Sequence, residues 1–225
     1  MLDGLDGYAL AALALSLRVA TIATALVALV GVPAGYLLAR RAFFGRELID
    51  ALVTLPLVLP PTVVGYYLIL LLGRSGLLGA PIYRWTGWSV MFTWHAAVVA
   101  SFVVALPFMI KTSRAAIEAV DRTLLDASYT LGHSELWTAL RVTLPLARRG
   151  IAAGAVLSFA RAMGEFGATL MLAGNIPGRT STMPLEIYGS VAGGEWGRAH
   201  LLVLLFTGVS ALALYGANRL SRSSP

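Results

Sequence analysis

Five stretches of this chain stay apolar for about 20 residues or more, and no other feature limits its possible folds as strongly. They cover residues 8–39, 48–72, 88–110, 151–173 and 199–220. A helix of about 20 apolar residues is long enough to cross the hydrocarbon core of a bilayer. Only 12% of the residues are charged, about half of the share in a soluble domain. We therefore predict one domain over residues 1–225, an all-α polytopic membrane helix bundle with five transmembrane helices.

The basic residues are concentrated in three of the segments outside these stretches. Of the 17 lysine and arginine residues, 11 follow the first stretch, join the third to the fourth, or close the fifth. These are Arg40, Arg41, Arg46, Lys111, Arg114, Arg122, Arg141, Arg148, Arg149, Arg219 and Arg222. Because cytoplasmic loops carry the excess of positive charge, we expect the N-terminus outside and the C-terminus in the cytoplasm. The net charge of +6 then reflects topology, and no nucleic-acid partner is expected.

The length of the first stretch, and glycine pairs in the first and at the start of the fourth, predict how these helices pack. Residues 8–39 are longer than a bilayer requires, so this helix must tilt or begin at the membrane interface. Pairs of glycines four residues apart allow close approach of helices. Such pairs occur at Gly31 and Gly35 and at Gly150 and Gly154, and for both we expect contacts within the chain.

Prolines interrupt the second stretch. Pro56, Pro60 and Pro61 precede Thr62, and each proline removes a backbone hydrogen bond and bends a helix. Inside a bilayer the freed carbonyl groups must be satisfied by neighbouring helices, hydroxyls or water. Two interpretations stay open: a broken helix that lines a transport pathway, and a fixed kink that helps packing.

A pair of opposite charges lies in the fourth stretch. Arg161 and Glu165 are four residues apart, so they share a helix face and can pair. Charges at membrane depth are costly and are usually paired or functional. A structural ion pair and a pair that lines a pathway both remain possible. Hydroxyls that could line the same pathway, or bond only to helix backbone, belong to Thr54, Thr62, Ser101, Ser158 and Thr169.

Residues 111–150 form a charged segment on the predicted cytoplasmic side. Thr123 and Asp126 resemble the first and last residues of a capping box, which predicts a short helix that Gly132 ends. Ser134 can cap a second short helix, and Pro145 is expected to end it. Apolar side chains in this pair of helices would need to pack under the bundle or against a partner protein.

This segment resembles the cytoplasmic loop of ABC importer permeases. That loop reads Glu-Ala-Ala, three residues, Gly, nine residues, Ile, any residue, Leu-Pro, and the spacing here is the same. Its matching residues, with conservative replacements at the first, third and fifth, are Asp126, Ala127, Ser128, Gly132, Val142, Leu144 and Pro145. The resemblance implies that the short helix docks in a cleft of a separate ATPase subunit.

Two further runs resemble molybdate permeases in particular. Residues 55–66 are similar to their second-span signature, and residues 163–169 and 173–180 to their fourth span and external scoop. The resemblance implies a type I importer fold and a homodimer in the inner membrane. It also implies two copies of the ATPase subunit and an external oxyanion-binding protein. Such an importer would move molybdate or tungstate by alternating access; a sulfate or thiosulfate permease is the alternative.

Several motifs of other functions are missing from the sequence. A phosphate-binding loop needs Gly-x-x-x-x-Gly-Lys-Ser/Thr, but the chain's one lysine, Lys111, follows Ile110. ATP and magnesium would therefore be bound by the partner ATPase, and the chain itself is not expected to be an enzyme. There is no cysteine, and His95, His133 and His200 lack ligand spacing, so no metal site is expected. An intramembrane enzyme and a membrane scaffold are the less favoured alternatives.

Overall fold

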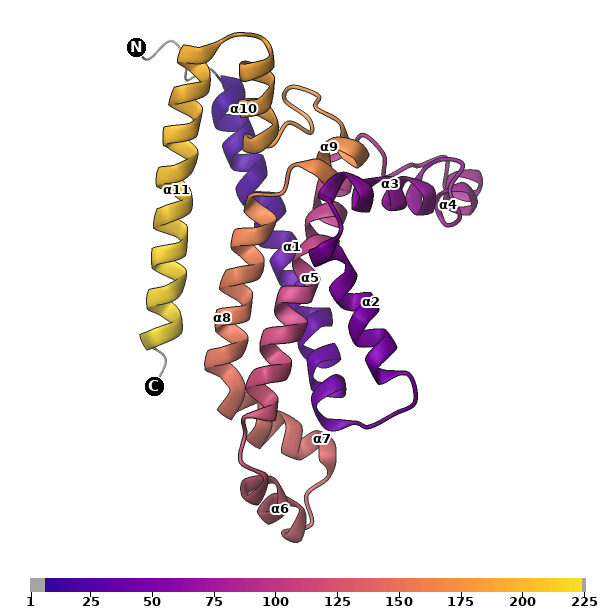
Figure 1. Cartoon of the computed structure of the whole chain (residues 1–225), viewed down its shortest axis with the longest axis vertical. Coiled ribbons are helices and arrows are strands. Elements are labelled where there is room, and N and C mark those ends of the chain that lie inside the picture. The colour runs from indigo at the N-terminus through magenta and orange to yellow at the C-terminus, as the bar shows by residue number, and fades with distance from the viewer. Residues whose placement is uncertain (1–6, 224–225) are drawn as a thin grey trace.

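Three long helices run through the molecule without a break. In the computed structural model, which describes residues 7–223, they are α1 (Gly7–Arg40), α5 (Trp94–Glu118) and α11 (Trp196–Ser223). All three are long and apolar enough to cross a membrane. Figure 1 shows that α1 and α11 begin at the same end of the molecule. No strand occurs among the described residues, so the predicted all-α class is confirmed.

Two further candidate spans are bent pairs of helices. The first pair, α2 (Arg46–Val58) and α3 (Pro61–Leu72), bends by 118°, and the second bends by 59° between α8 (Leu144–Met163) and α9 (Gly167–Ala173). If each pair counts as one span, the described residues contain five candidate spans. Pro60 is the residue before α3 and Pro61 its first residue, which is where a proline is tolerated in a helix.

Short helices gather at the two ends of the molecule. One end carries α6 (Arg122–Thr130), α7 (Glu135–Thr138) and the π-helical turn η1 (Ala139–Thr143), and α4 (Gly79–Thr86) and α10 (Met183–Ala192) lie towards the other (Figure 1). Pro184 lies in the first turn of α10, where a proline is tolerated.

The core forms where α1, α5 and α8 meet. An ideal Cβ on Gly31 would come within 2.7 Å of Met109, and one on Gly35 would clash with Ser113. On the other side of α5, a Cβ on Gly150 would strike Ala116 and one on Gly154 would strike Thr112. Both glycine pairs therefore let helices of the same chain approach closely, which confirms the expected contacts within the chain. Of the α5 residues that they meet, Met109 and Ser113 are buried.

Two predicted boundaries of the long helices are wrong. The third stretch was expected to be helical over 88–110, but α5 begins at Trp94 and continues to Glu118. Pro145 does not end a helix, because the chain stays helical from Glu135 to Met163. The turn η1 explains the second difference. In η1 the Leu144 N–H bonds to the Ala139 carbonyl, five residues back. This wider turn directly precedes a proline that cannot donate an ordinary helix bond.

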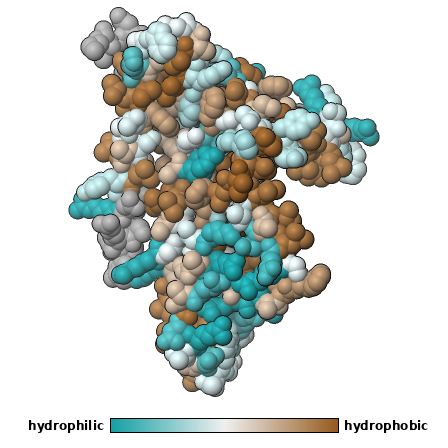
Figure 2. Space-filling model, viewed as in Figure 1, coloured by the Kyte–Doolittle hydropathy of each residue, from teal (hydrophilic) through white to brown (hydrophobic). Residues whose placement is uncertain are grey.

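The surface separates by polarity along the long axis. Figure 2 shows hydrophilic residues gathered at the end that carries α6, and hydrophobic residues over much of the surface above it. Large apolar side chains such as Leu29, Val58 and Leu204 are mostly exposed in the single chain. Surface of this kind is covered by lipid or by protein in a membrane assembly. The side chain of Arg222, one of the 11 basic residues expected on the cytoplasmic side, lies outside the described ones.

Candidate functional site

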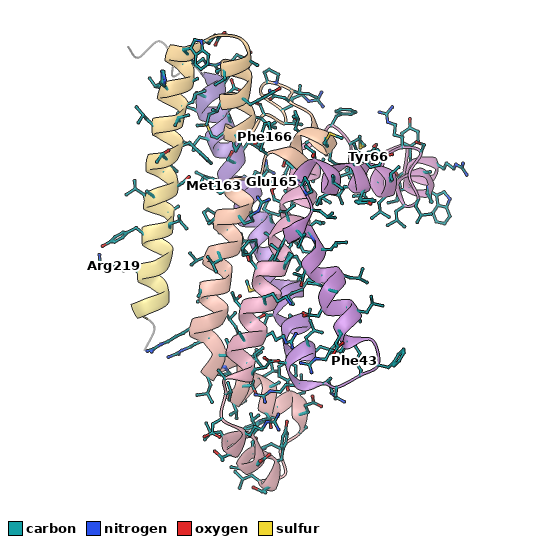
Figure 3. All side chains as sticks on the ribbon, viewed as in Figure 1. Phe43, Tyr66, Met163, Glu165, Phe166 and Arg219 are labelled. Carbon is teal, nitrogen blue, oxygen red and sulfur yellow. The ribbon has the colours of Figure 1, made fainter. Side chains whose placement is uncertain are left out.

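The two broken spans meet at their breaks. Gly167, the first residue of α9, faces Pro61 at the start of α3, so closely that a Cβ would lie 2.9 Å from the proline ring. One turn further along α3, Gly65 faces Ala168, with 3.0 Å from an ideal Cβ to the Ala168 Cα. The second-span and fourth-span motifs are thus neighbours in space, and glycine makes this contact possible. Figure 3 shows Tyr66, Glu165 and Phe166 in this region.

Glu165 holds the break between α8 and α9 in place. Its side chain is buried, and its Oε1 accepts a hydrogen bond of 2.8 Å from the Ala168 N–H, in the first turn of α9. Its Oε2 lies 2.8 Å from the Arg161 guanidinium on the last turn of α8. The predicted pairing is therefore present. The carboxylate caps one helix and neutralises a charge on the other, as a structural ion pair would.

The remaining residues predicted for the pathway differ in how far their side chains are exposed. Pro60, Pro61 and Thr62 lie exposed on the surface of the single chain, whereas Pro56 is half-buried inside α2. Thr62 therefore presents a hydroxyl on an open surface at the break.

Other candidate hydroxyls hold helices together. Ser101 and Ser158 are buried and donate to the Ala162 and Ala105 carbonyls, so they bridge α5 and α8. Thr54 donates to the backbone of its own helix at Asp50. These three hydroxyls satisfy backbone carbonyls and are not free to line a pathway.

The second candidate site is the α6–α7 corner. The helix α6 begins two residues earlier than the capping-box prediction, because its N-cap is Asp121 and not Thr123. Asp121 caps it by accepting the Thr123 N–H at 2.9 Å, and this bond lowers the pKa of the Asp121 carboxyl. The prediction failed because Thr123 and Asp121 are both good caps, and only the backbone path distinguishes them. Gly132 ends the turn with φ of +83°, as predicted. Ser134 caps α7 by accepting the Trp137 N–H.

Side chains of this corner point in two directions. Ser128 is buried and shares a hydrogen bond of 2.7 Å with Thr138, and Val142 and Leu144 pack against the small core around Ile117. The Ser128 bond thus joins α6 to α7, and Val142 and Leu144 fix the corner to α5. On the outside, Asp126, Ala127, Gly132 and Pro145 are exposed. They are joined there by the apolar side chains of Leu124, Leu131, Leu136 and Trp137. The corner is thus anchored on one side and offers an apolar surface on the other.

An ionic network ties α2 to α5 beside this corner. The Asp50 carboxylate accepts from Lys111 at 2.7 Å and lies 3.2 Å from Arg114. Glu118 then bridges Arg114 at 2.9 Å and Arg46 at 3.3 Å. Of these contacts, only the pair Arg114 and Glu118 can be predicted from the sequence, because the two residues are four positions apart. The other partners lie 61 or more residues apart, and local spacing cannot reveal them.

Most of the sequence matches a known protein family. Residues 31–223 match the model of the binding-protein-dependent transport system inner membrane component. The chain belongs to this family. It is therefore an integral membrane permease subunit of an ABC importer, and the part of the family model that it matches includes both broken spans and the α6–α7 corner.

Individual relatives of this permease extend over most of its length. It is 43% identical over 195 residues to the molybdenum transport system permease protein ModB of Escherichia coli K12. These aligned residues cover 86% of this chain and 85% of ModB. It is 38% identical over 219 residues to ModB of Azotobacter vinelandii, covering 96% of both. Among solved structures, an inward-facing MetNI methionine ABC transporter superposes with a TM-score of 0.76 at 17% identity, over 99% of both chains. That likeness concerns the fold.

Proposed function

We propose that this permease subunit moves molybdate, or the nearly identical tungstate, into the cytoplasm. The observation that carries the proposal is the identity of 43% and 38% with molybdenum transport permeases over nearly whole chains. The second-span and fourth-span motifs support it further, because they pack together at the breaks of α3 and α9. A permease that specialises in one substrate class needs its distinctive residues where the substrate passes.

The power for transport comes from a separate subunit in this proposal. Two copies of the chain form the pathway, two ATPase subunits bind ATP and magnesium below, and an oxyanion-binding protein delivers substrate from outside. The exposed apolar surface of the α6–α7 corner supports such docking, because it is fixed to α5 through Leu125 and Val142, which pack in the small core around Ile117. Motion of the ATPase subunits would then reach the spans through packed helices.

Alternating access requires two arrangements of the same bundle that ligands bind unequally. The residues proposed for the pathway are Pro56, Pro60, Pro61, Thr62, Arg161 and Glu165. Glu165 and Arg161 would keep the α8–α9 break in one shape while neighbouring helices move. Thr62, exposed at the other break, can contact a passing oxyanion. The pathway needs no tight site, since capture belongs to the external binding protein.

Uptake by the complete transporter tests the proposal. The chain is reconstituted in vesicles with its ATPase, and radiolabelled molybdate is supplied with the binding protein. We expect uptake that requires ATP and that unlabelled tungstate suppresses at much lower concentrations than sulfate. Suppression by sulfate or thiosulfate alone would make the chain a permease for those anions. ATP-independent accumulation would contradict the importer mechanism.

A further inference from the structure

Two arginines without carboxylate partners line one depression at the end of the molecule opposite α6. Arg18 lies on α1, and Arg179 lies in the loop between α9 and α10. The depression has a volume of about 480 Å³, and Trp94 and Ser181 also line it. A second depression of about 170 Å³ shares Arg179 and Trp94. Within residues 7–223, neither guanidinium forms an ion pair with a carboxylate.

The Arg18 guanidinium is held in a geometry that leaves its donors available. It lies over the Trp94 ring, 4.0 Å from the ring centroid. A cation–π contact of this kind holds the guanidinium at the ring face. It uses none of the N–H donors, which can therefore bind the oxygens of an anion.

The other polar groups of this region are already occupied. The Ser181 hydroxyl donates to Glu186 at 2.6 Å, and the Glu186 carboxylate also pairs with Arg198 at 2.6 Å. The Thr180 hydroxyl donates to the Gly174 carbonyl. The nearby carboxylate is therefore neutralised by its own partners, and the positive charge of Arg18 and Arg179 stays uncompensated. His95 stacks on Trp94 and lines the second depression.

The length of α1 sets the depth of this pair in the membrane. Arg18 lies 22 residues before Arg40, the last residue of the helix, which is about 33 Å along the axis. The hydrocarbon core is about 30 Å thick. If Arg40 lies at the cytoplasmic boundary, Arg18 reaches the outer boundary, where tryptophans such as Trp88 and Trp94 commonly lie.

We propose that Arg18 and Arg179, supported by Trp94, form a binding site for a tetrahedral oxyanion group. The site lies at the external boundary of the hydrocarbon core. Such a group carries several oxygens that two guanidinium forks can bind together. A free oxyanion and the phosphate of a lipid headgroup share this chemistry. The free-oxyanion source rests on the proposed molybdate function, and the headgroup source does not.

The test uses the complete transporter in lipid nanodiscs, with an Arg18→Gln/Arg179→Gln variant. Arg84→Gln is the matched control, because Arg84 is exposed at the same end but lines neither depression. In phosphatidylcholine discs, binding of radiolabelled molybdate is measured by equilibrium dialysis. In discs that also contain phosphatidylglycerol, the lipid retained after extraction is counted by native mass spectrometry. Arg179→Gln alone replaces the double variant if that variant does not fold.

We expect the double variant to weaken molybdate binding at least about tenfold, or to lose the retained phosphatidylglycerol, while Arg84→Gln matches the wild type. A loss in the first measurement identifies a free oxyanion, and a loss in the second identifies a headgroup. The proposed site is refuted if wild type and double variant bind the same amount of molybdate and retain the same amount of phosphatidylglycerol. It is also refuted if Arg84→Gln shows the same loss as the double variant. ATP-driven uptake by the wild type is measured separately, so failure of the proposed function is distinguished from failure of this site.

Discussion

Gly132 is the residue on which the shape of the α6–α7 corner depends most directly. Its φ of +83° lies in the left-handed region, and a Cβ there would meet no atom within 4 Å. The demand for glycine is therefore conformational, at about 1–2 kcal/mol for most other residues. The surrounding surface is apolar and exposed, so a charge at this position would also oppose docking of a partner.

Gly132→Asp should leave the protein inserted in the membrane but lower ATP-driven uptake several-fold. Uptake and ATP hydrolysis by reconstituted transporter check this together, and hydrolysis should persist without matching uptake. Gly87→Asp is the control, because Gly87 also has a positive φ, of +66°, and open space around it, but lies at the opposite end. Equal losses at both positions would mean that backbone strain alone, and not coupling, explains the effect.

Glu165 combines two roles that substitution can separate. Glu165→Gln keeps an acceptor for the Ala168 N–H but removes the charge that pairs with Arg161, whereas Glu165→Ala removes both. We expect Glu165→Ala to lower the free energy of unfolding by about 2 kcal/mol. This figure is below the usual 3–5 kcal/mol for breaking a buried pair, because the Arg161 side chain is 26% exposed.

Thermal unfolding in detergent measures this series. Glu165→Gln should fall between wild type and Glu165→Ala. Adding Arg161→Ala to Glu165→Ala should recover part of the loss, since it removes the unpaired positive charge. If the double variant is less stable than Glu165→Ala by the full cost of Arg161→Ala alone, the two residues do not interact, and the proposed role at the break is wrong.

Among the elements, the contact between α1 and α5 depends on a close approach of backbones. Gly35 leaves no space for a side chain, because its Cβ would clash with the Ser113 hydroxyl and lie 3.0 Å from the Ile110 carbonyl. Gly35→Ala should therefore reduce the yield of folded protein, with overpacking of about 1–3 kcal/mol. Gly208→Ala in α11 has nothing within 4 Å and should keep or raise the yield. Size-exclusion profiles of both variants provide the measurement.

The ionic network around Asp50 leads to a second prediction, which concerns the attachment of α2 to α5. Asp50→Asn weakens the attachment of α2 to α5 while leaving Arg114 paired with Glu118. The pairs are partly exposed, so the stability cost should stay within about 1 kcal/mol, yet the amides of α2 should exchange hydrogen faster. Hydrogen exchange measured by mass spectrometry checks this, with α11 as the internal reference. Unchanged exchange in α2 would show that packing alone holds it.

The predictability of each element follows from the range of its interactions. Long apolar stretches predicted the helices, and local signals predicted the Gly132 stop and the Ser134 cap. The end at Pro145 was mispredicted because η1 lets the helix continue past a proline. The start of α5 was missed because residues 88–93 are apolar whether coiled or helical.

In the candidate sites, too, contacts between residues close in sequence were predictable and distant ones were not. The α6–α7 corner was predictable because its residues lie within 20 positions of one another. Prolines predicted a break before α3, but not its angle of 118°, which depends on packing against α9 through Gly65 and Gly167. The ionic network joins Asp50 to Lys111 across 61 residues. No spacing rule reaches that far.

As a whole molecule, the chain has the properties of one part of a larger assembly. Most of α11 is exposed in the single chain, and only 11% of its most apolar window is buried. The α6–α7 corner presents apolar side chains at the hydrophilic end shown in Figure 2. A permease that takes its energy from a cytoplasmic ATPase must expose this corner to the cytoplasm, and the proposed mechanism depends on this orientation.

Site-directed cysteine labelling tests this orientation most directly, since the chain has no cysteine of its own. Leu131 and Leu77 lie at opposite ends with nearly equal exposure, 76% and 77%. In cells that also make the ATPase subunit, the Leu131→Cys variant should resist an impermeant maleimide and cross-link to that subunit. The Leu77→Cys variant should be labelled from outside and form no such cross-link. Labelling of Leu131→Cys from outside would contradict the account.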